Sequence, residues 1–192
     1  NYQYKDKYYL GAIIRRDGSS RFGANHRYGY FPGVNAAWRL TEENFMKGQD
    51  ILSDLKIRAS YGLTGNQDID NYAFASMYYT NISTSSYPIA GDPNSVTQGI
   101  SKESIGNPDL KWETVAKADI GIHAVFFERL TLEVDYYNQR TKDMIFDVPL
   151  SYTTGFGSIL KNVGEMENKG IEFLINANVL RNKDFSWDVR FT

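Results

Sequence analysis

The sequence predicts an all-β fold that forms an antiparallel transmembrane β-barrel segment. Three observations support this prediction. Apolar side chains occupy every second position over long runs, aromatic residues make up 15% of the chain, and the connections between runs alternate between short and long. Alternation is typical of a strand with one apolar and one polar face. Aromatic rings suit a membrane interface because Tyr and Trp join an apolar body to a polar tip.

The clearest run extends from Lys111 to Phe126. One face holds Trp112, Thr114, Ala116, Ala118, Ile120, Ile122, Ala124 and Phe126, and the other holds Glu113, Lys117, Asp119 and His123. At about 3.3 Å per residue such a run extends roughly 50 Å, whereas common strands reach about 17–20 Å. A bilayer requires only about 9–11 tilted residues. The extra length predicts strands that project beyond the membrane.

The elements before this run show the same pattern. Tyr8 to Arg15 predicts a first strand, and Asp17–Arg27 a polar loop that contains glycine. Tyr28 to Leu40 predicts a second strand, Thr41–Asn44 a capped helical turn, and Leu55 to Thr64 a third strand. These residues therefore predict three wall strands.

A long loop is predicted over residues 65–110, where alternation weakens and Ser, Thr, Asn, Gly and Pro accumulate. Tyr72 to Thr80 predicts a short strand inside it, as one arm of a hairpin that stands above the barrel. We expect this loop to be extracellular. We also expect residues 1–192 to form part of one β-barrel domain.

The C-terminal part adds three strands after Phe126. They are predicted over Leu130–Asn138, Gly170–Leu180 and Phe185–Phe191, with tight turns at Phe127–Arg129 and Arg181–Asp184 and a long loop over Thr141–Lys169. The total of about seven strands is too small for a closed barrel, which needs at least about eight. Short turns at one end and long loops at the other are typical of periplasmic and extracellular ends.

Composition argues against several classes of protein. The chain has no Cys, which excludes disulfides and thiolate metal sites, and it has no apolar stretch long enough for a membrane-spanning helix. The net charge is −2 and no basic stripe is present, so we expect no nucleic-acid partner. No Ser lies at an elbow turn with a basic partner. We therefore expect neither an enzyme nor a cofactor.

Two loops contain candidate ion sites. The segment Arg16-Asp17-Gly18-Ser19-Ser20-Arg21 offers an anion cradle, but the favoured interpretation is a solvated turn in which an Arg–Asp pair joins neighbouring loops. Asp68, Asp70 and Asn71 cluster oxygen ligands that suit calcium, yet the spacing departs from the EF-hand pattern at Tyr72. An ordinary polar loop is favoured there.

Histidines and aromatic residues supply the other candidates. His26 and His123 are the two histidines, and neither has a second metal ligand at suitable spacing, so a structural role is favoured and His123 is expected to face the lumen. Tyr78, Tyr79, Tyr87 and Trp112 lie near the long loops and could stack on sugar rings or peptide side chains. The alternative, an aromatic belt at the membrane interface, is favoured for each ring. No residue is assigned as a ligand contact.

Ordered motifs along the chain resemble one known family. They are Arg15-Arg16-Asp17-Gly18-Ser19-Ser20-Arg21-Phe22-Gly23, Gly29-Tyr30-Phe31-Pro32, Ala36-Ala37-Trp38-Arg39-Leu40, Leu55-Lys56-Ile57-Arg58-Ala59-Ser60-Tyr61-Gly62, Thr64-Gly65-Asn66-Gln67, Asn107-Pro108-Asp109-Leu110-Lys111-Trp112-Glu113-Thr114, Asp135-Tyr136-Tyr137-Asn138, Thr154-Gly155-Phe156, Asn162-Val163-Gly164 and Glu167-Asn168-Lys169-Gly170. This series resembles the C-terminal barrel of SusC/RagA-type TonB-linked outer-membrane transporters of Bacteroidetes.

The resemblance implies more than the residues themselves do. It implies a nutrient importer in the cell outer membrane, with a barrel of roughly 22 strands, an N-terminal plug, a SusD-like surface lipoprotein as lid, and energy drawn through TonB. The implied substrate is a glycan or a peptide. On this interpretation the plug and the TonB box lie outside these residues, and the chain is an internal part of the barrel wall in contact with outer-membrane lipid.

A second hypothesis is a protein that does not transport, either a surface adhesin or a soluble β-sandwich that binds a ligand. A sandwich would pack the apolar face of each strand inside a protein core. The barrel hypothesis instead directs Ile120, Val134, Phe173 and Val189 outward, away from a lumen. The environment of these four side chains separates the two hypotheses.

Overall fold

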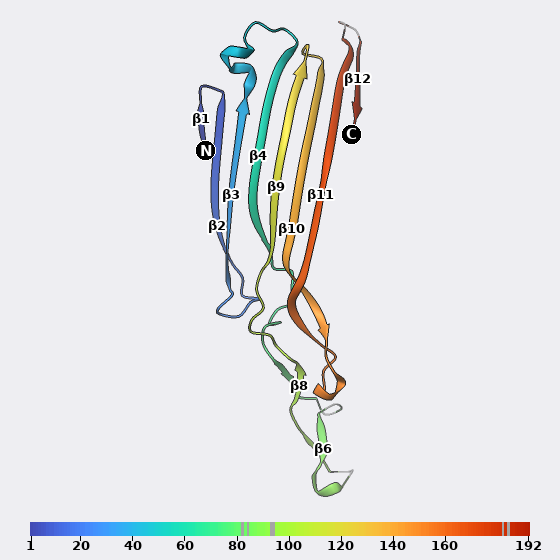
Figure 1. Cartoon of the computed structure of the whole chain (residues 1–192). Helices are drawn as coiled ribbons and strands as arrows, with labels where there is room; N and C mark the ends of the chain where they lie inside the picture. Colours follow the sequence, from blue (N-terminus) through green and yellow to red (C-terminus); the bar gives the residue numbers. More distant parts are fainter. Residues whose placement is uncertain (82, 84, 93–94, 182, 184) are drawn as a thin grey trace.

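The large sheet forms the main body of the chain. The computed structural model describes residues 1–81, 83, 85–92, 95–181, 183 and 185–192. In this part, eight strands form one open antiparallel sheet in a single layer, in the order β1-β2-β3-β4-β9-β10-β11-β12 (Figure 1). The strands are β1 (Tyr2–Tyr4), β2 (Tyr8–Gly18), β3 (Tyr28–Arg39), β4 (Leu52–Asn66), β9 (Glu113–Phe126), β10 (Leu130–Pro149), β11 (Ser158–Arg181) and β12 (Ser186–Phe191). The predicted all-β, antiparallel fold is confirmed.

One face of this sheet is apolar and uncovered. A single row of directly paired residues crosses six strands on this face: Leu10, Ala36, Ala59, Ile120, Tyr136 and Ile171. Ile120, Phe173 and Val189 are 58%, 52% and 43% exposed, as the barrel hypothesis predicts, and Val134, which is paired with Phe173 on the same face, is half-buried. Within the described residues no second sheet covers them (Figure 1). The β-sandwich alternative therefore has no packed interior to support it.

A charged cluster closes the end of the sheet at which η1 (Leu40–Glu42) and η2 (Asn44–Met46) connect β3 to β4. The Glu43 carboxylate accepts hydrogen bonds from Tyr8 Oη at 2.6 Å and from Lys7 Nζ at 2.9 Å. These bonds, and a third from Trp38 Nε1, lower the pKa of Glu43 to about 2. Glu43 is therefore charged at neutral pH and holds the turn against β2 and β3.

The predicted helical turn at Thr41–Asn44 is present as two 3-10 turns, but its predicted side-chain cap is wrong. Neither turn has a side-chain hydrogen bond at its N-terminus. Thr41 Oγ1 instead donates to Asp54 Oδ1 at 3.1 Å, and Arg39 Nε donates to the same oxygen at 2.7 Å. The hydroxyl is used to attach the turn to β4.

The described residues of 67–110, here called the arm, extend beyond the opposite end of the sheet (Figure 1). Two small sheets build it: β5 (Met77–Tyr79) pairs with β8 (Ser101–Ser104), and β6 (Ser86–Pro88) pairs with β7 (Val96–Gln98). The 3-10 turn η3 (Ile89–Gly91) lies between β6 and β7. The short strand predicted within Tyr72–Thr80 is confirmed as β5, which belongs to a hairpin-like arm.

The prediction of a long loop over Thr141–Lys169 is wrong, because most of these residues belong to two long strands. Strand β10 continues to Pro149, β11 begins at Ser158, and the connection between them contains η4 (Tyr152–Thr154). The pairing shifts between Lys142 and Ile145, where Asp143 has a φ of 57°. This bulge and the charged pairs beside it, such as Lys142 opposite Glu165, hide the apolar alternation on which the prediction relied.

Three smaller predictions have different outcomes. The tight turn at Phe127–Arg129 is confirmed, because Arg129 N–H donates to Phe126 O at 2.9 Å and both Phe127 and Glu128 have positive φ. The turn predicted at Arg181–Asp184 lies partly outside the described residues. The predicted count of about seven wall strands omitted β1, whose three residues are too few to show alternation.

Among the described residues, no helix has the length and hydropathy that a membrane span requires.

Candidate functional site: the polar face and the loop cluster

The face opposite the apolar row forms an open polar groove. Its volume is about 860 Å³, and it crosses β3, β4, β9, β10 and β11. Hydrogen-bonding and charged side chains make up most of its lining: Asn35, Lys56, Arg58, Ser60, Lys117, Asp119, Asp135, Tyr137, Gln139, Asn168, Lys169 and Glu172. Because strand side chains alternate between faces, the same strands that expose Ile120 outward direct these groups into the groove.

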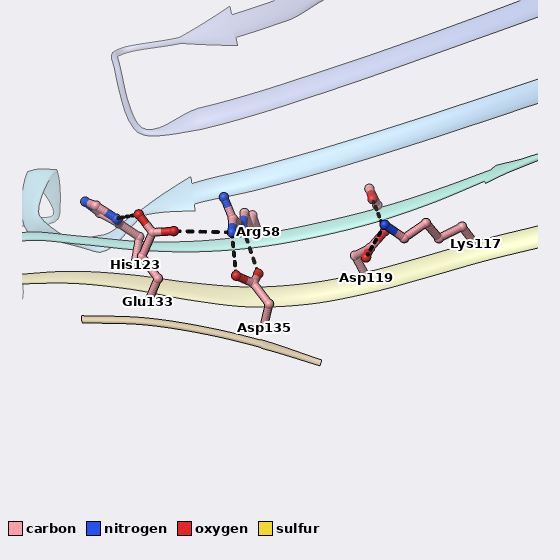
Figure 2. Close-up of polar contacts among 7 residues, drawn as sticks. Arg58, Lys117, Asp119, His123, Glu133 and Asp135 are labelled. Carbon is pink, nitrogen blue, oxygen red and sulfur yellow. Dashed lines mark hydrogen bonds and ion pairs between the residues drawn. The ribbon is translucent and has the colours of Figure 1, made fainter. Parts of the chain in front are cut away.

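An ion-pair network crosses three strands in this face (Figure 2). Arg58 on β4 donates from Nη2 and Nε to the two carboxylate oxygens of Asp135 on β10, at 2.6 and 3.1 Å. Glu133 lies 3.7 Å from the same guanidinium and 3.1 Å from His123 Nδ1. The Arg58 side chain is 49% exposed, so we expect solvent screening to limit the pair to about 1 kcal/mol. The network fixes the positions of these side chains across the three strands but adds little to the free energy of unfolding.

Gly121 on β9 makes room for this network. It is paired with Arg58 on one side and with Asp135 on the other, so the ion pair passes directly over it. A Cβ atom at this position would lie 2.8 Å from Arg58 Nε and closer still to the Asp135 carboxylate. A glycine inside a strand often marks such a close approach. Any side chain at residue 121 would displace the Arg58–Asp135 pair.

The Gly121→Ala substitution is expected to destabilise the full-length protein by about 1 kcal/mol, because the ion pair must move. Denaturant unfolding of the purified protein in detergent measures this. Gly62→Ala is the matched control, since the nearest atom to a Cβ there is 3.8 Å away. In an Asp135→Ala background, Gly121→Ala should have little further effect. An equal loss at both glycines would contradict this explanation.

Two other charges of the groove, Lys117 and Asp119, are paired with each other. Lys117 Nζ lies 3.4 Å from Asp119 Oδ1 (Figure 2). Ser60 Oγ donates to Asp119 Oδ2 at 3.3 Å. No group of three or more potential metal ligands gathers anywhere in the described ranges. The groove therefore presents cationic and anionic side chains together with neutral hydrogen-bonding groups.

A second feature, the loop cluster, joins the β2–β3 loop, strand β3 and the base of the arm. It consists of Phe22, Phe31, Leu110 and Trp112. Phe22 and Leu110 are fully buried, and the Trp112 ring centroid lies 5.2 Å from Phe22 and 5.6 Å from Phe31. Strands β3 and β4 are paired only as far as Gly33 and Gly62 at this end, and the cluster packs beyond that point. It forms a small core that the wall itself lacks.

Hydrogen bonds to the backbone reinforce the loop cluster. Trp112 Nε1 donates to Arg27 O at 3.4 Å, which connects the base of the arm to the β2–β3 loop. Asn107 Nδ2 donates to Leu160 O, and Asn162 Nδ2 donates to Lys111 O, both at 2.8 Å. These bonds connect the arm to β11. The Asn107–Thr114 and Asn162–Gly164 motifs in the sequence thus connect the arm to the sheet.

Close backbone packing explains another motif residue. A Cβ at Gly23 would lie 2.8 Å from the carbonyl oxygen of Pro108, so the β2–β3 loop and the base of the arm touch through a position that requires glycine. Next to it, Arg21 Nη1 donates to Gln67 O at 3.3 Å and lies 4.0 Å from Asp68. The two loops are in contact along this edge.

The candidate anion cradle does not assemble. Arg15 pairs with Asp17, the Arg16 guanidinium lies over the Tyr28 ring, and Arg21 reaches Gln67 and Asp68, so the guanidinium groups diverge. The favoured interpretation, an Arg–Asp contact between neighbouring loops, matches the Arg21–Asp68 approach.

The remaining candidates are dispersed or buried. Trp112 is 8% exposed within the loop cluster, so both interpretations of it, a ligand contact and a belt residue, are wrong. Tyr78 and Tyr87 are exposed on β5 and β6, while Tyr79 is half-buried. Their ligand role stays a prediction. His123 lies in the polar face with Glu133, and His26 N–H donates to Gly23 O within the β2–β3 loop.

Sequence comparisons agree with this architecture. The family model described as TonB dependent receptor-like, beta-barrel matches residues 1–192. TonB-dependent receptor P3 of Formosa agariphila is 40% identical over 192 residues, which cover all of this chain and 18% of that receptor. TonB-dependent receptor SusC of Bacteroides thetaiotaomicron is 37% identical over 194 residues and is covered to 19%. The chain spans about a fifth of the length of these relatives.

Solved structures give the same result. The RagAB peptide importer matches with a TM-score of 0.85 in its closed-closed state, at 35% identity, over 99% of this chain and 20% of that chain. Its open-open state matches with a TM-score of 0.86 at 34% identity, again over 99% and 20% of the two chains. The siderophore receptor PirA of Pseudomonas aeruginosa shares the fold alone, at 18% identity and a TM-score of 0.56, over 97% of this chain and 31% of that chain.

The motif resemblance noted in the sequence is thereby confirmed. The family model matches the whole chain, and SusC and RagAB are similar over nearly all of it. The chain belongs to the TonB-dependent receptor β-barrel family and is of the SusC/RagA type.

Proposed function

We propose that this chain is part of the barrel wall of a longer outer-membrane receptor that imports a nutrient. The apolar face contacts lipid, the polar groove lines the lumen, and the arm stands on the extracellular side. The observation that supports this best is a continuous single-layer sheet with one uncovered apolar face and one polar face that carries both signs of charge. In a water-soluble protein the uncovered apolar face would be in contact with water, which is energetically unfavourable and favours aggregation.

The transported nutrient and the partners are part of the same proposal. The RagAB relatives are described as peptide importers, which favours a peptide, and a glycan is the alternative for a SusC-type receptor. We infer a SusD-like lipoprotein lid above the arm, and TonB acting through a region outside these residues. The wall provides a rigid frame for both, because the loop cluster ties the β2–β3 loop and strand β3 to the base of the arm. No catalytic step is proposed.

Growth on defined nutrients tests this function. Bacteria that lack the gene of the full-length receptor should fail to grow on at least one peptide mixture or glycan that supports the parent strain. Wild-type receptor supplied in trans should restore growth, and deletion of TonB should reproduce the defect. Membrane fractionation of the complemented strain locates the receptor. Unimpaired growth on every such nutrient would count against import.

A further inference from the structure

Arg16 lies on the apolar side of the sheet, at the edge where that side meets the arm end. Strand β2 presents Leu10, Ala12, Ile14 and Arg16 in alternation on this face, and Ile14 is 73% exposed. Tyr30 is directly opposite Arg16, and Tyr28 is opposite Gly18. A single cation thus ends an apolar row and stands between two tyrosines. A charge at this position is at the boundary of a lipid-facing band.

The two tyrosines hold the Arg16 guanidinium in place. The guanidinium carbon lies 4.0 Å from the centroid of the Tyr28 ring and 5.6 Å from that of Tyr30. Gly18 makes room for this contact, since a Cβ there would lie 2.8 Å from Tyr28 Cε1. Both rings are more than half exposed. A cation braced over aromatic rings keeps the edge of its N–H fork available to an anion.

Arg16 differs from Arg15 and Arg140 because, among the described residues, no carboxylate pairs with it. Arg15, on the other face, pairs with Asp17 at 2.8 Å. Arg140, which shares the outward side, is paired with Glu165. Among the described residues, Arg16 makes only its ring contacts. A guanidinium that lies next to exposed apolar surface and has no counter-charge can bind an anionic group whose molecule also carries apolar chains.

We propose that Arg16, Tyr28 and Tyr30 form a binding site for the phosphate group of a membrane lipid. The guanidinium fork matches two phosphate oxygens. The tyrosine hydroxyls lie at headgroup level, as interfacial aromatic residues do, and the acyl chains lie along Ile14 and the apolar rows behind it. The inference rests on the proposed membrane placement of this face and adds a specific lipid contact to it.

Native mass spectrometry of the full-length receptor in detergent tests the site. The probe is a monophosphorylated glycolipid, compared with the same glycolipid after removal of its phosphate. Arg16→Gln should weaken binding of the phosphorylated lipid about tenfold and leave binding of the dephosphorylated lipid unchanged. Arg15→Gln, one residue away on the opposite face, is the matched control and should bind as wild type does. Arg16→Lys should bind with intermediate affinity, because it retains charge without the fork.

Each other outcome overturns the site. Equal losses for Arg16→Gln and Arg15→Gln, or equal binding of the two lipids, would remove the role of Arg16. Full competition by millimolar inorganic phosphate would mean a free-anion site and would contradict a lipid headgroup. Because lipid binding is measured on purified receptor, it is independent of the growth test. Should Arg16→Gln not assemble, the Arg16→Lys variant and the dephosphorylated lipid decide the result.

Discussion

Replacing Trp112 with alanine is expected to destabilise the arm end of the full-length receptor by about 3–5 kcal/mol, the usual cost of removing a large buried aromatic side chain. The indole packs against Phe22 and Phe31 and is the one buried ring with a hydrogen bond to another loop, at Arg27 O, in the described part of the chain. Loss of these contacts should detach the base of the arm from the β2–β3 loop while the large sheet stays folded.

Limited trypsin digestion reports on this release. Lys102 is the only Lys or Arg in residues 67–110, so cleavage after it measures how often the arm opens. We expect cleavage to be roughly tenfold faster or more in Trp112→Ala. Trp187→Ala, which removes an exposed indole on β12, is the matched control. Equal protection of Trp112→Ala and wild type would refute the role of the loop cluster as a clamp.

Placing a charge on the apolar face is the second large effect. Ile120→Arg is expected to cost about 2–4 kcal/mol in a bilayer, because the new guanidinium would face hydrocarbon near the middle of the apolar row. Chemical unfolding of the receptor in lipid vesicles measures this loss, and the shift in gel mobility on heating reports the folded fraction.

Ser60→Arg separates burial in lipid from a general effect of arginine. Ser60 is paired with Asp119, one residue before Ile120, and its side chain enters the polar groove. The added guanidinium would lie in water near a carboxylate, so we expect a change within about 0.5 kcal/mol. Similar losses for the two variants would mean that the face of Ile120 does not contact lipid.

The wall strands could be predicted because alternation is a local signal. Ile120 and Lys117 belong to opposite faces by their spacing alone, and the pairing confirms it. Alternation fails where both faces are polar. In β11, Glu165 and Glu167 occupy outward positions beyond the apolar band, so the strand continues through residues that read as a loop.

The cluster and the network could not be predicted because their partners are distant in sequence. Trp112 is separated from Arg27, its hydrogen-bond acceptor, by 85 residues, and Arg58 from Asp135 by 77. The alternation of apolar residues does not reveal which aromatic rings pack together, so Trp112 was interpreted as a surface residue. Gly121 was the available signal: a glycine between polar strand positions indicates a close approach, although not the identity of the groups that approach.

The pairing of β4 with β9 has a further consequence. These strands remain hydrogen-bonded from Leu52 and Phe126 to Asn66 and Glu113, although the whole arm intervenes between them. Closing a flexible insert costs only about 0.6 kcal/mol more for each doubling of its length. Insertions and deletions within the arm are therefore expected to leave the pairing of β4 with β9 in place, so the length of the arm can change while the sheet stays the same.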